Sequence, residues 1–483
     1  MIAGQLRPAT GRLAVQAQPY YVPQVSGSFD HMTVAQALHV ADKLHALQKI
    51  LGGDMNDTHL ATLNDDWNIE ERCHEALAQW QLHDVGPGRN MGTLSGGQKM
   101  KVLLAGIYIH RPRLILLDEP SNHMDTGSRQ ILYAMVRDLN ATMIVVSHDR
   151  QLLELLPTIC ELGRNGITTY GGGYAFYRTQ KEIALSALGD DIKSKEKELR
   201  KAREKERETA ERQQKLDARG RKKQEKAGTP TIMLNTLRNN AEKSTSKLRD
   251  VHAEKIGGIA NDLRQLRAAL PELDKMKMAF ANAALHKGKV LFSAQGMNHS
   301  YTGKPLWKKD LDIVVTSGER ISLKGDNGTG KTSLIKMMLG ELAPMKGAVT
   351  RAEHTTAYID QDTSLLNDGL SVFEQVRTYN RMALQEHEIG IWLGRFLFGY
   401  DEWGKPCAAL SGGERMRLVL CCLSVAEQAP DMMILDEPTN NLDMQNVDIL
   451  TAAISAYRGT LIVVSHDAWF LQQLGVEREI LLE

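Results

Sequence analysis

Two copies of one ordered set of motifs occur in this 483-residue chain, and this duplication restricts its fold more than any other feature. Each copy contains an LSGG motif, then an apolar run that ends in Asp-Glu-Pro, then the sequence VVSHD. The first copy has these motifs at residues 94–98, 114–125 and 145–149. The second copy has them at residues 410–414, 433–443 and 463–467. The chain is therefore expected to contain two domains of the same fold, with a further segment between them.

Each copy is predicted to have an α/β fold. Short apolar runs rich in β-branched residues are typical of parallel strands that are covered on both faces. Such runs predict strands at residues 114–117, 143–146, 433–435 and 461–464. Helical stretches are predicted at residues 97–110 and 413–427, each before one of these strands. This alternation of helix and strand predicts a parallel sheet covered by helices.

A glycine-rich loop, GDNGTGKT at residues 325–332, precedes the second copy. It matches G-x-x-x-x-G-K-[ST] and lies between a predicted strand at 320–323 and a predicted helix at 333–339, which is the context that a phosphate-binding loop requires. Backbone N–H groups and a helix N-terminus would surround the phosphates, Lys331 would reach the β- and γ-phosphates, and Thr332 would bind Mg²⁺. The predicted phosphate-binding residues are Gly325, Asp326, Asn327, Gly328, Thr329, Gly330, Lys331, Thr332 and Ser333.

Four polar residues after the predicted strands of the second copy form a candidate catalytic set. Asp436 and Glu437 follow the strand at 433–435, so both carboxylates would lie at the edge of the sheet beside the phosphate loop. Asp436 suits Mg²⁺ binding through water, and Glu437 would orient or deprotonate the attacking water, a role worth roughly 10²- to 10⁴-fold in rate. His466 would donate to the γ-phosphate, and Gln361 would contact Mg²⁺ or the water. The predicted Mg²⁺-binding residues are Thr332, Gln361 and Asp436.

In this order, these residues resemble the ATP-binding cassette superfamily, in which LSGGQ and LSGGE match the signature motif. The resemblance implies two P-loop cassettes that face head to tail, so that the phosphate loop of one meets the signature of the other. Across one ATP, the second cassette would then face Ser95, Gly96 and Gly97 of the first. The family also places an aromatic residue under the adenine. Tyr301 matches that position, although Trp307 is nearby and a core role for either ring remains open.

The same pairing implies a mirror site. Its residues would be Gln24, Asp118, Glu119 and His148 of the first cassette with Ser411, Gly412 and Gly413 of the second. Residues 290–336, which include the phosphate loop, have no counterpart in the first copy, so this cassette is expected to lack its N-terminal part and the mirror site to be degenerate. Either the native protein begins further upstream or the loss is real. The intact Glu119 and His148 favour the former.

The first copy also has an insertion. Residues 1–8 and 337–344 align 336 positions apart, whereas the LSGG motifs are 316 positions apart. The 20 additional residues are expected around residues 51–67 as a surface excursion.

The segment between the copies, residues 178–289, is basic and helical in pattern. It contains 28 Lys and Arg against 17 Asp and Glu, while the whole chain has no net charge. Apolar residues three, four and seven positions apart along 182–216 and again along 237–273 predict two antiparallel helices, with a turn at 228–230. Residues 219–249 carry a net charge of +7, which suits contact with RNA phosphates, although a solvated spacer is the alternative. The candidate RNA contacts are Arg219, Arg221, Lys222, Lys223, Lys226 and Arg238.

Two fused cassettes with a basic helical hairpin, and the sequence DDWNIEER at 65–72, resemble the ABC-F branch of the superfamily. Members of that branch act on the ribosome, where the hairpin enters from the tRNA exit site and contacts P-site tRNA. The resemblance implies a cytoplasmic, monomeric ATPase that uses ATP and Mg²⁺, with cassettes at 1–177 and 290–483 and rRNA and tRNA as partners. Ser121, Met124 and Asn441 depart from the usual TNHLD and leave the subfamily open.

Other function classes fit the sequence less well. The longest apolar candidate, residues 131–146, contains Arg137 and Asp138, so no membrane span is predicted, and the N-terminus lacks the pattern of a secretory signal. The five cysteines lack metal-binding spacing and are expected to be buried thiols. The alternatives are the ATPase subunit of a transporter with separate membrane subunits, or a DNA-associated ATPase.

Overall fold

The computed structural model describes the chain except residues 1, 25–26, 164–165, 227–249, 269–284, 302, 327, 382, 441 and 483. The side chains of 213, 217 and 220–226 are also outside the description. The chain forms two compact units. The main unit comprises Met1–Leu156 and Lys275–Glu483 and contains both repeats, and the hairpin unit comprises Pro157–Asp274.

The second repeat is built on a five-stranded parallel sheet. The strand order is β10 (Thr356–Ile359), β11 (Met432–Asp436), β12 (Thr460–Val464), β8 (Arg320–Lys324) and β13 (Arg478–Leu481). Every residue of β11 and β12 is buried, as the continuous apolar runs predicted. The helices are α10 (Lys331–Leu339), α11 (Val372–Tyr379), α12 (Glu386–Arg395), α13 (Gly412–Val425), α14 (Met444–Ala456) and α15 (Ala468–Gln473). A separate antiparallel sheet contains β7 (Leu311–Thr316), β6 (Val290–Asn298) and β9 (Lys346–Arg351).

The first repeat has a smaller sheet of the same type. Its parallel strands are β1 (Tyr20–Val22), β2 (Leu114–Asp118) and β3 (Thr142–Val146). They correspond to β10, β11 and β12, and counterparts of β8 and α10 are not found among the residues described. The helices are α1 (Val34–Ala37), α2 (Ala41–Leu51), α3 (Asp57–Leu63), α4 (Ile69–Gln79), α5 (Gly96–His110), α6 (Thr126–Asp138) and α7 (Arg150–Glu154). The strand–helix alternation and the four predicted strands are confirmed.

The additional residues of the first repeat form two helices, of which only the second lies within the predicted range 51–67. The second repeat passes from α11 to α12 in a short connection, whereas the first repeat has α2 and α3 between α1 and α4. Helices α2 and α3 pack against each other, and most of α3 is exposed. The expected surface excursion is therefore confirmed for α3, with a helical structure that its polar sequence did not reveal, whereas α2 ends where the predicted range begins and buries Leu44, Leu47 and Ile50.

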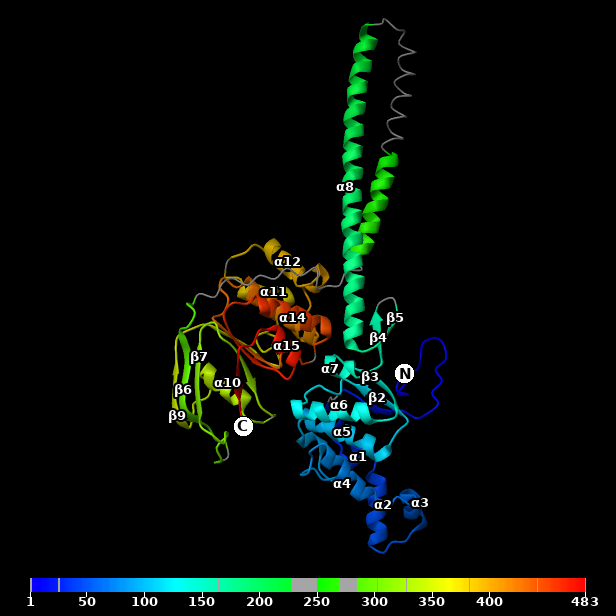
Figure 1. Cartoon of the computed structure of the whole chain (residues 1–483), viewed down its shortest axis with the longest axis vertical. Helices are drawn as coiled ribbons and strands as arrows, with labels where there is room; N and C mark the ends of the chain where they lie inside the picture. The colour runs from blue at the N-terminus through cyan, green and yellow to red at the C-terminus, as the bar shows by residue number, and fades with distance from the viewer. Residues whose placement is uncertain are drawn as a thin grey trace. The chain divides into compact units, whose positions relative to one another are not determined.

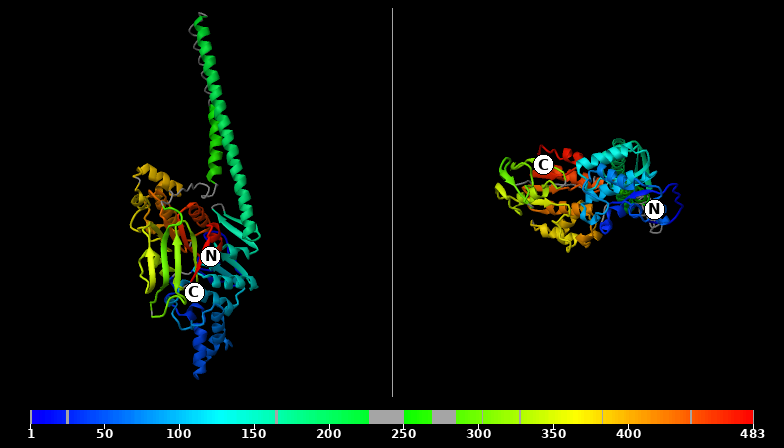
Figure 2. Two further views of the ribbon diagram at one scale, coloured as in Figure 1. Left: turned by 60° about the vertical axis from the view of Figure 1, so that its left-hand side comes forward. Right: turned by 90° about the horizontal axis from the view of Figure 1, so that it is seen from below.

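The hairpin unit begins with the antiparallel pair β4 (Thr158–Gly163) and β5 (Gly166–Gly171), followed by the long helix α8 (Tyr174–Lys226). Residues 250–268 form a second helix that lies beside α8 (Figures 1 and 2). Lys195 bonds Asp262 at 3.2 Å and Arg267 bonds Glu196 at 2.6 Å between these helices. The two helices therefore pair as predicted along this part. The predicted turn at 228–230 and residues 237–248, 270 and 273 lie outside the described residues.

Strands β4 and β5 belong to the hairpin unit, whereas the sequence analysis placed their residues in the first cassette. Strand β5 packs on α8, where the rings of Tyr170 and Tyr177 make an edge contact at 5.0 Å. Cys160, on β4, is exposed, so the prediction that all five cysteines are buried is wrong. A two-stranded sheet cannot cover both faces of its strands, which explains the exposure of this thiol. The boundaries 1–177, 178–289 and 290–483 stay predictions.

Candidate nucleotide-binding site

The glycine-rich loop connects β8 to α10 and has a conformation that glycine favours. Gly328 has φ +88° and Gly330 has φ +86°, both in the left-handed region. A Cβ atom on Gly330 would lie 2.6 Å from Leu306, so a larger residue would displace that side chain. Trp307 supports the loop, because its Nε1 donates to the carbonyl oxygen of Thr329 at 2.9 Å. Of the two aromatic candidates, Trp307 is thus the core residue, and the sequence did not reveal its bond to the loop.

Lys331, the first residue of α10, folds back over its own loop. Its Nζ donates to the carbonyl oxygen of Gly325 at 2.7 Å and to that of Asp326 at 2.9 Å. Burial lowers the pKa of Lys331, while the nearby carboxylates of Glu437 and Asp436 oppose that shift. The ammonium group therefore lies inside the loop, where a phosphate would meet it. Asn327, also predicted to bind phosphate, lies outside the described residues.

Two hydroxyl groups, from α10 and β10, converge on Asp436, at the end of β11. Thr332 donates from Oγ1 to Asp436 Oδ2 at 3.4 Å, and the Tyr358 hydroxyl donates to the same oxygen at 3.1 Å. Burial raises the pKa of Asp436, and these two hydrogen bonds act against the rise. A hydroxyl and a carboxylate side by side are the hard oxygen ligands that Mg²⁺ prefers, so the residues present fit this ion. Tyr358 was not predicted as a site residue, although it lies in the strand that precedes Gln361.

Glu437 and His466 form a close buried pair. Glu437 has φ +49°, and its backbone N–H donates to the carbonyl oxygen of Val464 at 2.9 Å, which fixes it beside β12. His466 Nε2 lies 3.4 Å from Glu437 Oε1, and neither atom has a hydrogen-bond partner among the residues described. Burial raises the pKa of Glu437 to about 7, against the positive charge of Arg129, and burial lowers the pKa of His466 to about 4. Two buried polar atoms are thus available to a ligand.

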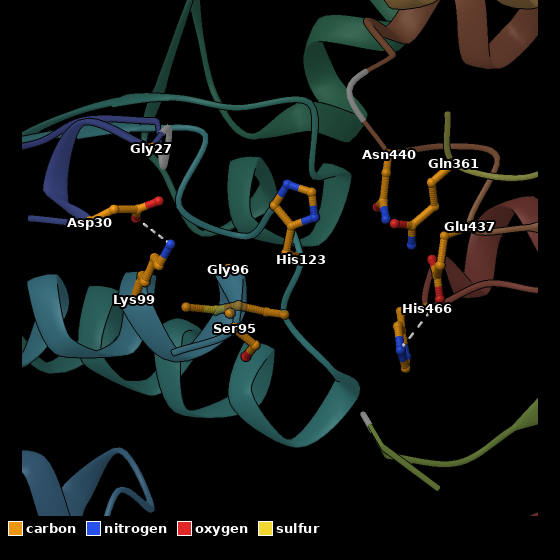
Figure 3. A pocket seen from close by; sticks show the side chains of 12 residues that line it. Gly27, Asp30, Ser95, Gly96, Lys99, His123, Gln361, Glu437, Asn440 and His466 are labelled. Atoms are coloured by element: carbon orange, nitrogen blue, oxygen red, sulfur yellow. Dashed lines mark hydrogen bonds and ion pairs between the residues drawn. The ribbon is translucent and has the colours of Figure 1, made fainter. Parts of the chain in front are cut away.

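One cavity of about 450 Å³ contains residues of both repeats (Figure 3). Ser95 and His123 of the first repeat lie on one side, and Gln361, Glu437 and His466 of the second lie on the other. The full lining is Gly27, Asp30, Ser95, Gly96, Gly97, Lys99, His123, Met124, Gln361, Glu437, Asn440 and His466. A neighbouring cavity of about 380 Å³ is lined by Ser95, Gly97 and, from the glycine-rich loop, Gly328. Asp30, Lys99, His123 and Asn440 were not predicted.

The start of α5 presents the LSGGQ motif to this cavity. Ser95 caps the helix, because its hydroxyl accepts from Gln98 N at 3.3 Å while the Gln98 side chain accepts from Ser95 N at 3.0 Å. The N–H groups of the first helical turn have no acceptor within the helix, so they suit an anion. Lys99 and Asp30 form an ion pair at the same end of the helix. The motif therefore adds anion-binding groups opposite Glu437 and His466.

The predicted mirror residues of the first repeat have nearly the same local geometry. Glu119 has φ +48°, and its Oε1 lies 3.3 Å from His148 Nε2. Tyr21 donates to Asp118 Oδ2 at 3.2 Å. Gln24 is exposed beyond β1. Ser411 caps α13, but Gly412 lines a cavity with Gln361 and Glu437 of its own repeat. Ser411, Gly412 and Gly413 therefore stay only predicted partners of the first repeat.

The remaining candidates lie outside the cavity. Tyr301 is 65% exposed, and its hydroxyl lies 3.0 Å from Ser333 Oγ at the start of α10. That position beside the phosphate loop is compatible with a base-stacking role. Arg219 is exposed on α8. Arg221, Lys222, Lys223 and Lys226 belong to α8, but their side chains, and all of Arg238, lie outside the described residues.

Comparisons with known proteins connect this geometry to a family. The family model described as "ABC transporter" matches residues 1–122 and 308–440, more than half of the chain. The ATP-binding protein Uup of Escherichia coli K12 is 30% identical over 452 residues, which are 90% of this chain and 64% of Uup. The ABC transporter F family member 5 of Arabidopsis thaliana is 28% identical over 93% of this chain and 62% of its own length. The chain thus spans less than two thirds of either relative.

A solved structure has the same fold. It is the complex of an archaeal ribosomal stalk protein with the archaeal ribosome recycling factor aABCE1, with a TM-score of 0.57 and 18% identity over 96% of this chain and 72% of that one. Within the described part of the chain, no helix has both the length and the apolar character that a membrane span needs.

Proposed function

Because the chain belongs to the ATP-binding cassette family, and within it to the ABC-F branch, we propose that it binds and hydrolyses ATP and acts on the ribosome. Hydrolysis would be the step that permits its release. The observation that carries the enzymatic part is the shared cavity, in which the start of α5 from one repeat faces Glu437 and His466 of the other.

Each side chain around that cavity has its own role in the proposed reaction. Lys331 and the loop around Gly328 would hold the β- and γ-phosphates, and the N-terminus of α5 would close on the γ-phosphate from the opposite repeat. Burial raises the pKa of Glu437 to about 7, and its carboxylate would orient the attacking water and accept its proton. His466 would donate to the γ-phosphate. Gln361, which lines the same cavity, would contact the water.

Mg²⁺ is part of this proposal. Thr332, Asp436 and Gln361 would hold the ion, directly or through water. When bound, the ion would neutralise charge on the phosphate oxygens. Tyr358 orients the Asp436 carboxylate for this role through its 3.1 Å hydrogen bond.

The ribosomal part of the proposal depends on the hairpin unit. Helix α8 extends over 53 residues and leads into the region with a net charge of +7. A long basic arm suits the phosphate backbone of RNA, and each phosphate contact adds about one unit to the salt dependence of binding. We propose that this arm contacts rRNA or tRNA, that the protein is monomeric with its cassettes paired within the chain, and that it functions in the cytoplasm.

A sedimentation experiment tests the function as a whole. Cells expressing Glu437→Gln would be lysed, and the lysate separated on a sucrose gradient, with Glu119→Gln as the matched control. We expect Glu437→Gln to accumulate with 70S ribosomes, because ATP binds but is not cleaved, and Glu119→Gln to behave like the unmodified chain. Retention of the Glu437→Gln protein on membranes or on DNA would instead support the transporter or DNA-associated alternatives.

A second experiment tests the arm. Replacing Arg221, Lys222 and Lys223 by alanine should weaken cosedimentation with ribosomes, and the deficit should grow with salt concentration. Replacing Lys193, Lys197 and Lys201, nearer the start of α8, by alanine removes the same charge from another part of the helix. Equal loss in both triple variants would mean that total charge, rather than the far part of the arm, determines binding.

A further inference from the structure

A hydrogen bond crosses between the two repeats at the edge of the catalytic cavity. Thr126 is the first residue of α6 in the first repeat, and His466 follows β12 in the second repeat. Thr126 Oγ1 lies 3.2 Å from His466 Nδ1, although 340 positions separate the two residues. Thr126 itself has no assigned role in the reaction proposed above.

The bond matters because the histidine ring has two different nitrogens. A neutral imidazole carries one proton, and the partner of one nitrogen decides which nitrogen holds it. Burial keeps His466 neutral by lowering its pKa to about 4. Its Nε2 is buried and has no hydrogen-bond partner among the residues described, whereas Nδ1 lies within hydrogen-bond distance of the Thr126 hydroxyl. When that hydroxyl donates to Nδ1, the one proton of the neutral ring is on Nε2.

We propose that Thr126 is a positioning residue that acts across the repeats: by donating to His466 Nδ1, it holds the ring with the Nε2 proton directed into the cavity. There an anionic phosphate oxygen would accept this proton. The inference rests on the proposed function for the identity of that anion, but the choice of tautomer does not require nucleotide.

The second repeat has no hydroxyl at the position of Thr126. Asp125 caps α6 and Asp443 caps α14 through the same side-chain bond, so Thr126 and Met444 occupy equivalent positions. A methionine thioether has no proton to donate. His148, the equivalent of His466, therefore has no matching donor at this position of the opposite repeat. Among the residues described, a hydroxyl at this position is found only beside the site that contains the glycine-rich loop.

The bond also connects pairing of the repeats to the chemistry. Asp125 and Ser128, on either side of Thr126 in sequence, line the same cavity as Ser95 and Gly328. When the repeats separate, the Thr126 hydroxyl leaves Nδ1, and the ring is free to change its tautomer. His466 would then present a correctly placed proton only while the signature motif is also in place.

Nitrogen-15 NMR of histidine-labelled protein tests the proposal directly. The shifts of the two ring nitrogens report which one carries the proton, and a His466→Gln variant assigns the signals. We expect the Nε2–H form in the unmodified chain, a mixture of both forms in Thr126→Val, and the original form again in Thr126→Ser. Thr126 is exposed, so valine does not disturb the core. Met444→Thr is the control and should leave the His466 signals unchanged.

Kinetics provide a second readout. Thr126→Val should lower kcat about three- to tenfold with little change in KM, the effect of one hydrogen bond, and Thr126→Ser should restore it. A predominant Nδ1–H form in the unmodified chain, or an unchanged His466 spectrum in Thr126→Val, would overturn the proposal. The tautomer could respond as expected while neither the unmodified chain nor any variant hydrolyses ATP. In that case the proposed function is wrong, but the positioning role of Thr126 stands.

Discussion

The glutamate–histidine pairs of the two repeats are close structural copies. Glu119 and Glu437 have φ values of +48° and +49°, and their carboxylates lie 3.3 Å and 3.4 Å from the partner histidines. Burial raises the pKa of both glutamates to about 7. Five residues of identical sequence, VVSHD, combined with Asp-Glu-Pro, are thus enough to build this local geometry twice.

The surroundings of the two pairs differ. Strand β12 lies between β11 and β8 and is fully buried, whereas β3 pairs with β2 and alternates between exposed and half-buried residues. As a result, the His148 side chain is 43% exposed and that of His466 only 13%. A short motif therefore sets the local geometry of the pair, but the elements beside it decide how deeply the histidine is buried.

The largest difference between the two repeats is expected in the rate of ATP hydrolysis when the carboxylate of Glu437 or of Glu119 is removed. Glu437→Gln should lower kcat for ATP hydrolysis roughly 10²- to 10⁴-fold, because the water loses its proton acceptor. Glu119→Gln should lower it less than about twofold. Steady-state phosphate release from purified protein measures both. An equal loss in the two variants would mean that the first repeat contributes a second working site.

Acid stability should also distinguish the histidines. Burial gives His466 a pKa of about 4 in the folded state, against about 6.5 in the unfolded state. The contribution of the neutral, buried ring to the free energy of unfolding is therefore fully present above pH 6.5. That contribution, up to about 3 kcal/mol, is lost as the pH falls from 6.5 toward 4. His466→Gln should therefore lose less stability over this window than the unmodified chain.

His148→Gln provides the comparison, because its more exposed ring should change the acid sensitivity less. Urea midpoints at pH 7 and pH 4.5 measure both differences. Identical pH dependence in the His466→Gln variant and the unmodified chain would contradict the burial of this imidazole.

Nucleotide affinity should depend on the lysine of the glycine-rich loop. Lys331→Ala should weaken ATP binding about tenfold to a hundredfold, since it removes a charge-assisted hydrogen bond to phosphate. Lys324→Ala removes an equal charge from an exposed ion pair with Glu479 on the same sheet and should leave affinity unchanged. Titration with a fluorescent nucleotide compares the affinities of the two variants. A similar loss of affinity in both would mean that Lys331 contributes only its positive charge and no specific contact to phosphate.

The smallest effect should come from a contact between the repeats that has no counterpart among the residues described. Arg150 pairs with Asp448 at 2.6 Å and lies 3.2 Å above the ring of Trp469, whereas the residue equivalent to Arg150 in the second repeat is Ala468. Arg150→Ala should raise KM for ATP about three- to fivefold, because the repeats pair less firmly. Arg150→Lys keeps the charge but loses the planar contact, so an intermediate KM is expected. No change in either variant would rule out a pairing role.

The sequence predicted β2, β3, β8, β11 and β12 to within one residue at each end, because buried parallel strands have continuous apolar runs, but it gave no bounds for the other strands of the repeats. Local motifs also identified Lys331, Asp436 and Glu437, whose positions follow from the chain immediately around them. The contacts that the sequence did not reveal are long-range. Trp307 to Thr329, Tyr358 to Asp436 and Thr126 to His466 depend on how whole elements pack, and no local pattern records that.

The central claim is that Lys331 and Ser95, from different repeats, bind the same triphosphate. A structure of the Glu437→Gln variant with ATP and Mg²⁺ tests it most directly. We expect Lys331 Nζ and Ser95 Oγ both within about 3 Å of oxygens of one γ-phosphate. If Ser95 instead faces away from the nucleotide in that structure, while the unmodified chain still hydrolyses ATP, the shared site does not exist.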